Sequence, residues 1–152
     1  MCIRDSSDNV LDGWRGADIL DGRGGNDTAS YEFSDNGVTI DLTLTIQTGG
    51  DAQGDRLISI ENLEGSEFND TLIGDLGNNG LIGGDGNDSL FGGDGNDTLN
   101  GDAGNDSLRG QAGDDTINGG DGNDFVSGSD GADTISGGAG DDALFGLSLI
   151  HI

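Results

Sequence analysis

The chain has 152 residues, enough for one domain and an appendage, and carries 30 acidic against 5 basic residues, a formal net charge of −25. This charge excludes nucleic acid as a partner and argues against an anionic membrane surface. Its 32 glycines and few aromatic residues are typical of disordered segments, so an ordered fold has to rest on a repeated pattern. We expect no membrane span.

Both termini are identified as translated sequencing adaptor. The codons allowed by residues 1–6 include a sequence whose reverse complement translates as residues 147–152. These two segments are therefore expected to be foreign to the protein, and the remainder to be an internal fragment of a longer chain. Because Cys2 and His151 are the only cysteine and histidine, we expect no disulfide, thiol or histidine chemistry.

Residues 7–30 contain the first two nine-residue units, 13–21 and 22–30, and the positions of such a unit are numbered 1 to 9 here. The second unit has Gly25 at position 4, Asp27 at position 6 and Ala29 at position 8. The same three residue types recur at the same offsets later in the chain. We therefore expect these two units to be upstream repeats.

Residues 31–64 interrupt the nine-residue register. Apolar and polar residues alternate from Val38 to Ile46, which predicts a half-buried strand. A glycine-rich turn leads to a second short strand at 57–60. We expect a β-hairpin that packs against the start of the following repeats and caps their apolar core.

The segment 65–146 contains nine consecutive units that begin with glycine, from Gly65 to Phe145. Position 8 is aliphatic in every unit, as Leu72, Leu81, Leu90, Leu99, Leu108, Ile117, Val126, Ile135 and Leu144. Position 6 is aspartate in all units but one, where Asn79 stands. We expect each unit to form a six-residue glycine-rich turn and a three-residue strand whose position-8 side chain points inward.

Two units, Gly83–Phe91 and Gly92–Asn100, fit the pattern G-G-x-G-x-D-x-U-x, where U is aliphatic. The array therefore resembles the calcium-binding nonapeptide repeats of RTX proteins. This resemblance implies an all-β fold, a right-handed parallel β-roll in which two nonapeptides form one coil. Loops 18 residues apart then stack, which places Asp70, Asp88, Asp106, Asp124 and Asp142 on one side and Asn79, Asp97, Asp115 and Asp133 on the other.

The resemblance also implies several Ca²⁺ ions, each bound between adjacent coils by position-6 aspartates and loop carbonyls. Calcium is a hard cation that takes six to eight oxygen ligands, and both groups supply oxygen. The implied metal ligands are Asp70, Gly86, Asp88, Gly95, Asp97, Gly104, Asp106, Gly113, Asp115, Gly122, Asp124, Gly131, Asp133, Gly140 and Asp142, with Asp27 and Asn79 as weaker ones. Five loops leave four gaps and four loops leave three, so seven ions are the maximum. Gaps next to Phe68, at a glycine position, and Asn79 are expected to be weak or empty.

The two faces of such a roll differ in their outward residues. One face has Ile73, Phe91, Phe125 and Phe145, and the other has mainly threonine and asparagine. Because exposed apolar clusters usually mark contacts, we hypothesise that the phenylalanine face packs against the remainder of the parent chain, catalytic or adhesive.

We expect the segment to be a calcium-induced folding and stabilising module of a secreted bacterial RTX protein, extended inside the cell and folded outside. The resemblance implies type I secretion. The alternative is the repeat region of a secreted RTX enzyme, protease or lipase, or of a toxin whose catalytic domain is missing here. An adhesin or ice-binding surface on the threonine/asparagine face is a further alternative. We expect no enzyme activity in the segment, because it has no nucleophile–base pair.

Overall fold

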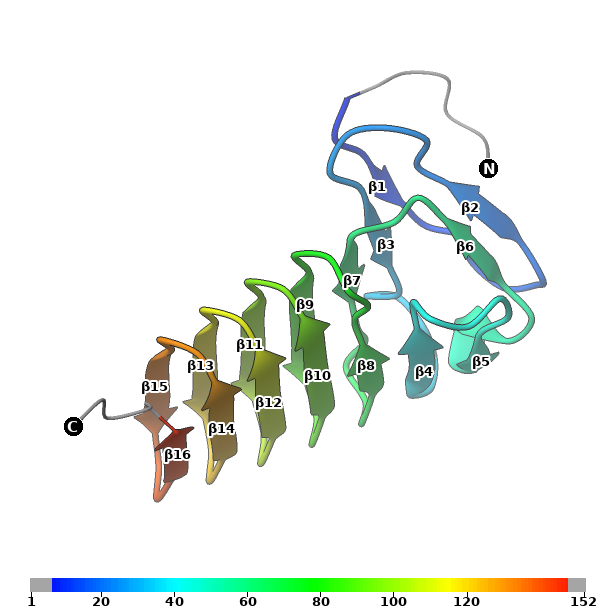
Figure 1. Ribbon diagram of the computed structural model, residues 1–152. Helices are drawn as coiled ribbons and strands as arrows, with labels where there is room; N and C mark the ends of the chain where they lie inside the picture. Colours follow the sequence, from blue (N-terminus) through cyan, green and yellow to red (C-terminus); the bar gives the residue numbers. More distant parts are fainter. Residues whose placement is uncertain (1–6, 148–152) are drawn as a thin grey trace.

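The chain folds into a parallel β-roll, which the computed structural model describes for residues 7–147 (Figure 1). From β7 to β16, consecutive strands alternate between two sheets, so that each pair of strands completes one coil. Sheet 1 contains, in spatial order, β1 (Val10–Leu11), β3 (Thr28–Ser30), β7 (Asn62–Glu64), β9 (Gly80–Asp85), β11 (Thr98–Ala103), β13 (Thr116–Asp121) and β15 (Thr134–Ala139).

Sheet 2 faces sheet 1 and ends in the only antiparallel pair among the described strands, β4 with β5. Its strands, in spatial order, are β16 (Ala143–Leu147), β14 (Phe125–Asp130), β12 (Ser107–Ala112), β10 (Ser89–Asp94), β8 (Thr71–Ile73), β4 (Val38–Asp41) and β5 (Thr48–Gly49). A small sheet 3 pairs β2 (Ile19–Asp21) with β6 (Arg56–Ile58), and a short 3-10 helix, η1, spans Gly50–Ala52.

The strands of the array are longer than the three residues expected. Strands β9 to β15 each have six residues, which run from position 7 of one unit to position 3 of the next. Only positions 4 to 6 are left for the turn. Position 1 is glycine, so the backbone can pass through it without placing a side chain in the interior, and pairing resumes at positions 2 and 3.

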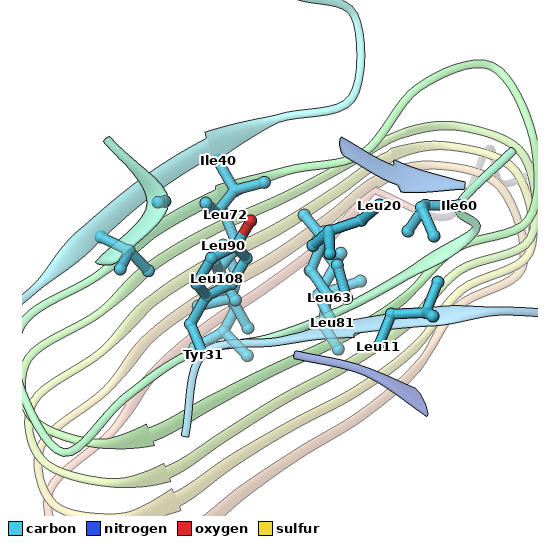
Figure 2. Packing of buried hydrophobic residues seen from close by; sticks show 14 of the residues in the cluster. Leu11, Leu20, Tyr31, Ile40, Ile60, Leu63, Leu72, Leu81, Leu90 and Leu108 are labelled. Atoms are coloured by element: carbon cyan, nitrogen blue, oxygen red, sulfur yellow. The ribbon is translucent and has the colours of Figure 1, made fainter. Parts of the chain in front are cut away.

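Stacked strands of the array pair residues that are 18 positions apart, for example Leu90 with Leu108 in sheet 2 and Leu99 with Ile117 in sheet 1. The expected coil of two nonapeptides is therefore confirmed. Side chains at position 8 form two columns inside the roll (Figure 2), and those from Leu72 to Val126 are at most 1% exposed. Burying each such side chain contributes about 1.5–3 kcal/mol. Leu144, in the last described coil, is 48% exposed.

The insert 31–64 contains an antiparallel pair, but the expected hairpin between 38–46 and 57–60 is wrong. The first strand ends at Asp41, where the backbone N–H and the hydroxyl of Thr43 both donate to the Asp41 carboxylate. The Gln47 side chain holds this turn by accepting from the Asp41 N–H. Leu44 and Ile46 consequently lie in an exposed loop, and the alternation from 38 to 46 continues only to Ile40 as a buried pattern.

The second strand of the insert pairs with the upstream repeats instead. Strand β6 lies parallel to β2, and β7 joins sheet 1 between β3 and β9. Residues 7–64 and the array thus share one continuous core. The insert adds six buried residues to it: Tyr31, Val38, Ile40, Ala52, Ile60 and Leu63. Of the strands in the insert, only β5 lies at the end of one of the two large sheets, where it follows β4 in sheet 2 (Figure 1).

Residues 1–6 and 148–152, which include Cys2 and His151, lie outside the described residues, so of the two segments interpreted as translated adaptor only Leu147 is described. Within residues 7–147, no helix is long and apolar enough to cross a membrane.

Candidate metal centre

Position-6 side chains form two ladders along the roll, as the 18-residue parity predicts. The backbone N–H of each ladder residue donates to the Oδ1 atom of the residue 18 positions later, at 2.8–3.1 Å. One ladder joins Asp70, Asp88, Asp106, Asp124 and Asp142, and the other joins Asn79, Asp97, Asp115 and Asp133. Each coil therefore orients the carboxylate of the coil that follows it.

The second carboxylate oxygen, Oδ2, is buried and has no hydrogen-bond partner in six position-6 aspartates: Asp27, Asp88, Asp97, Asp106, Asp115 and Asp124. An unpaired buried carboxylate oxygen costs several kcal/mol, because it loses water and gains nothing in return. Asp133 and Asp142, at the last described coil, are half-buried. Most ladder aspartates therefore have one buried carboxylate oxygen without a hydrogen-bond partner.

Each unpaired Oδ2 atom faces a space that only glycine leaves open. A Cβ added to Gly83, at position 1, would overlap the Oδ2 atom of Asp88 and lie 2.9 Å from the carbonyl oxygen of Gly101 in the next coil. The same convergence of a carboxylate and a carbonyl oxygen occurs beside Gly92, with Asp97 and Gly110. Beside Gly22, the oxygens come from Asp27 and Ser59. These oxygen pairs beside position 1 suit a hard cation such as calcium.

The position-4 glycines stack the coils. Gly86, Gly95, Gly104, Gly113, Gly122, Gly131 and Gly140 all have φ between +117° and +143°, a region that side-chain-bearing residues rarely adopt. The N–H of Gly86 donates to the carbonyl of Ala103 in the next coil, and the Gly86 carbonyl oxygen contacts Gly104. The carbonyl oxygens found beside the Oδ2 atoms are those of position 1.

Position-5 side chains form a further pair of ladders. The Oδ1 atom of Asn87 accepts from the N–H of Asn105, and that of Asn96 accepts from the N–H of Asp114. These bonds run opposite to the position-6 bonds, since here the side chain belongs to the earlier coil. Together the two sets tie each loop to both of its neighbours.

Burial changes the acidity of the ladder. Desolvation raises the pKa of Asp88 to about 7 and those of Asp97 and Asp106 to about 6, and like charges in neighbouring loops add to the effect. Desolvation also raises the pKa values of Asp70 and Asp115. The N–H bonds from the preceding coil oppose these shifts without cancelling them. A bound cation would remove this penalty, because it stabilises the charged form.

Two expected ligands are placed differently from the rest. The Oδ2 atom of Asp70 accepts from the backbone N–H of Ser66 at 2.5 Å and from its hydroxyl at 3.1 Å. The Asn79 side chain accepts from the N–H of Asp75 and donates to the carbonyl of Glu61, both at 2.8 Å. These are the units with Phe68 and Asn79, whose gaps the sequence predicts to be weak or empty.

Two ladder members in the insert were missed. Asp55 accepts from the N–H of Asp18 at 2.8 Å, and Glu61 accepts from the N–H of Asp27 at 2.9 Å, as position-6 residues do. The signal was present, because Asp55–Ile58 and Glu61–Glu64 each read acidic-x-aliphatic-x, the second half of a unit. In both segments, the residues before the acidic one lack the full set of glycines that marks the first half of a unit.

Replacing Asp106 by asparagine should weaken calcium binding. An amide keeps an oxygen at the ladder position but removes one charge, and ligand charge tunes calcium affinity. We expect calorimetry to show a rise of about tenfold in the calcium concentration at half-saturation, equivalent to ~1.4 kcal/mol. The control is Asp94→Asn, at an exposed position 3. Equal titrations for both variants would contradict the assignment.

The residues therefore fit a hard cation, since buried oxygens converge without a donor to pair with. A family model described as RTX calcium-binding nonapeptide repeat matches residues 5–29, 59–90, 91–126 and 118–148, together more than half of the chain. No curated protein matches the chain. The matched segments include both ladders and leave out most of the insert. The chain belongs to the family of RTX calcium-binding nonapeptide repeat proteins, and its β-roll is a calcium-binding one.

Proposed function

We propose that calcium folds this roll, and that the chain is a calcium-dependent folding and stabilising module. The observation that carries the proposal is the set of six buried Oδ2 atoms that have no protein partner. Without a cation, closing the coils buries these oxygens unpaired and brings a chain of net charge −25 together. With calcium, the same oxygens become ligands, so binding free energy becomes folding free energy.

We further propose five ions in the array, in the gaps that begin at Asp88, Asp97, Asp106, Asp115 and Asp124. Each of these residues has an unpaired Oδ2 atom and a following coil. A sixth ion is proposed at Asp27, whose following coil is the insert. Calorimetric stoichiometry tests this number, and seven ions in the array would contradict it.

Circular dichroism during a calcium titration of the chelated protein tests the folding proposal. We expect a coil-to-β transition at roughly 10⁻⁴–10⁻³ M calcium, as in extracellular modules, which chelator reverses. Magnesium is expected to support the transition poorly, because it demands smaller octahedral sites. A spectrum that is equally β-rich in chelator and in calcium would refute the proposal.

The parent protein is proposed to be a secreted bacterial RTX protein. A calcium threshold in this range would keep the chain extended where free calcium is low and fold it outside the cell. We propose that any enzymatic or toxin activity belongs to parts of the parent outside the array. Secretion of the parent, and its activity with and without the array, would test both statements.

The phenylalanine face supports a contact with the parent chain. On sheet 2, the rings of Phe125 and Phe145 lie 5.0 Å apart, and the Arg109 guanidinium lies 5.9 Å from the Phe91 ring and 5.7 Å from the Phe125 ring. Phe125 and Phe145 remain 39% and 50% exposed. Replacing Phe91 and Phe125 by serine in the parent should weaken the packing of its domains. Unchanged solubility and domain association would contradict this contact.

A further inference from the structure

Three ladder residues, Asp55, Asp70 and Asn79, differ from the others, because other protein groups already pair with the side-chain atom that elsewhere stays unpaired. We call each ladder residue a rung. The clearest is Asp55, a fully buried residue. Its Oδ1 atom accepts from the N–H of Asp18, as elsewhere on the ladders, but its Oδ2 atom accepts from the hydroxyl of Tyr31 at 3.1 Å. Tyr31 is itself only 2% exposed. A phenol therefore stands where the other rungs leave a carboxylate oxygen free for a cation.

The side chains of Asp70 and Asn79 are also paired with protein groups, but through different partners. At Asp70, the N–H and hydroxyl of Ser66 pair with Oδ2. At Asn79, the residue is a neutral amide and both of its polar atoms are paired, to Asp75 and Glu61. A cation at these rungs would have to displace a hydrogen bond, whereas at Asp88 it would only fill an unpaired position.

These rungs lie together in the fold. Asp55 precedes β6, Asp70 precedes β8 and Asn79 precedes β9. Strands β3, β7 and β9 are neighbours in sheet 1 and β4 pairs with β8 in sheet 2, whereas β6 pairs with β2, just before this region. The same region contributes Ala29, Tyr31, Val38, Ile40, Ala52, Ile60, Leu63, Leu72 and Leu81 to the core. The unpaired rungs flank it, with Asp27 before it and Asp88 and Asp97 after it. Residues 28–82 thus combine a local core with ladder positions that are already satisfied.

We propose that the Tyr31 hydroxyl, Ser66 and the Asp75 amide replace calcium at these three rungs, so that residues 28–82 stay folded without the ion and provide the end on which calcium closes the array. This inference rests on the proposed function for the array itself. It differs from that function in assigning one segment of the roll to calcium-independent folding. It also implies that the array grows from its N-terminal side as calcium binds.

Hydrogen exchange of the full chain, with chelator and with saturating calcium, tests the inference. In chelator we expect slow amide exchange in residues 28–82 and fast exchange in 89–139, and calcium should slow exchange in the second range only. Fast exchange in both ranges with chelator, followed by protection of both with calcium, would overturn the inference and leave the proposed function standing. Failure of calcium to protect 89–139 would instead refute the proposed function.

The variant Tyr31→Phe separates the hydroxyl from the ring. It leaves the Asp55 Oδ2 atom buried and unpaired, so residues 28–82 should come to depend on calcium. We expect at least tenfold faster exchange of β4 and β6 amides in chelator, and near wild-type exchange in calcium. A similar acceleration in both conditions would show a merely structural hydroxyl and overturn the inference. The control Thr98→Val removes an exposed hydroxyl on β11 and should change neither range.

Discussion

The variant Gly104→Ala is expected to lose about 2–6 kcal/mol of the free energy of unfolding in saturating calcium. An added Cβ would overlap the carbonyl oxygen of Gly86 in the preceding coil and lie 2.5 Å from its carbonyl carbon. Both obstacles are backbone, which cannot rotate away. The residue also has φ +140°, which costs about 1–3 kcal/mol for a residue with a side chain, and the overlap costs about 1–3 kcal/mol more.

Urea unfolding followed by circular dichroism measures this loss, which is large beside the ~5–15 kcal/mol that holds a typical domain together. The matched control is Gly24→Ala, because a Cβ there would meet nothing within 4 Å. We expect that control to stay within about 0.5 kcal/mol of the wild type. If Gly104→Ala unfolded at the wild-type urea concentration, the close stacking of position-4 glycines would be wrong.

Acid is expected to replace calcium in part. The pKa of Asp88 is raised to about 7 in the folded chain, and those of Asp97 and Asp106 to about 6, from an ordinary value of 3.8. Between pH 4 and 7 the metal-free folded chain therefore binds more protons than the unfolded chain. A state that binds more protons is stabilised as the pH falls. Lowering the pH through this range therefore stabilises the folded roll, and each unit by which a pKa is raised contributes ~1.4 kcal/mol to the free energy of unfolding.

Circular dichroism in chelator, from pH 8 to pH 4.5, measures this effect as a gain of β signal with a midpoint near pH 6. The variant Asp88→Asn cannot ionise at the most perturbed position, so its signal in chelator should be higher at pH 8 and depend less on pH. Asp85→Asn, which removes an exposed carboxylate, controls for the change in net charge. A metal-free spectrum that stays constant over the whole range would rule out buried carboxylates as the obstacle to folding.

The array was predictable because its pattern is local and strict. Nine glycine-led units fix an inward position 8, and a two-unit coil fixes which aspartates stack, so the ladders of Asp88 and Asp97 follow from the sequence alone. Strand length was underestimated because glycine at positions 1 and 2 usually indicates a turn. Here glycine keeps the strand going by leaving space for the Oδ2 atom of the same unit.

The insert was less predictable, because its ladder residues come without the glycines that mark a unit. Asp55 and Glu61 join the ladders through partners 37 and 34 residues away, Asp18 and Asp27, and no fixed period connects them. The apolar alternation after Ile40 has no partner strand, because the Asp41 turn takes the chain away from the sheet. Pairing of the Tyr31 hydroxyl depends on three-dimensional proximity, which one sequence does not encode in a pattern.

The alternation of nine-residue units between two sheets restricts how such a gene can change length. Loss or gain of 18 residues keeps every later unit on its own face of the roll. Loss or gain of nine preserves the inner leucines and the aspartates, which are alike in both halves of a coil, but moves all later units to the opposite face. Phe125 and Phe145 would then lie on the face of Thr98 and Asn100 rather than on the face of Phe91. Where the outer surface matters, repeats should therefore be inherited in pairs.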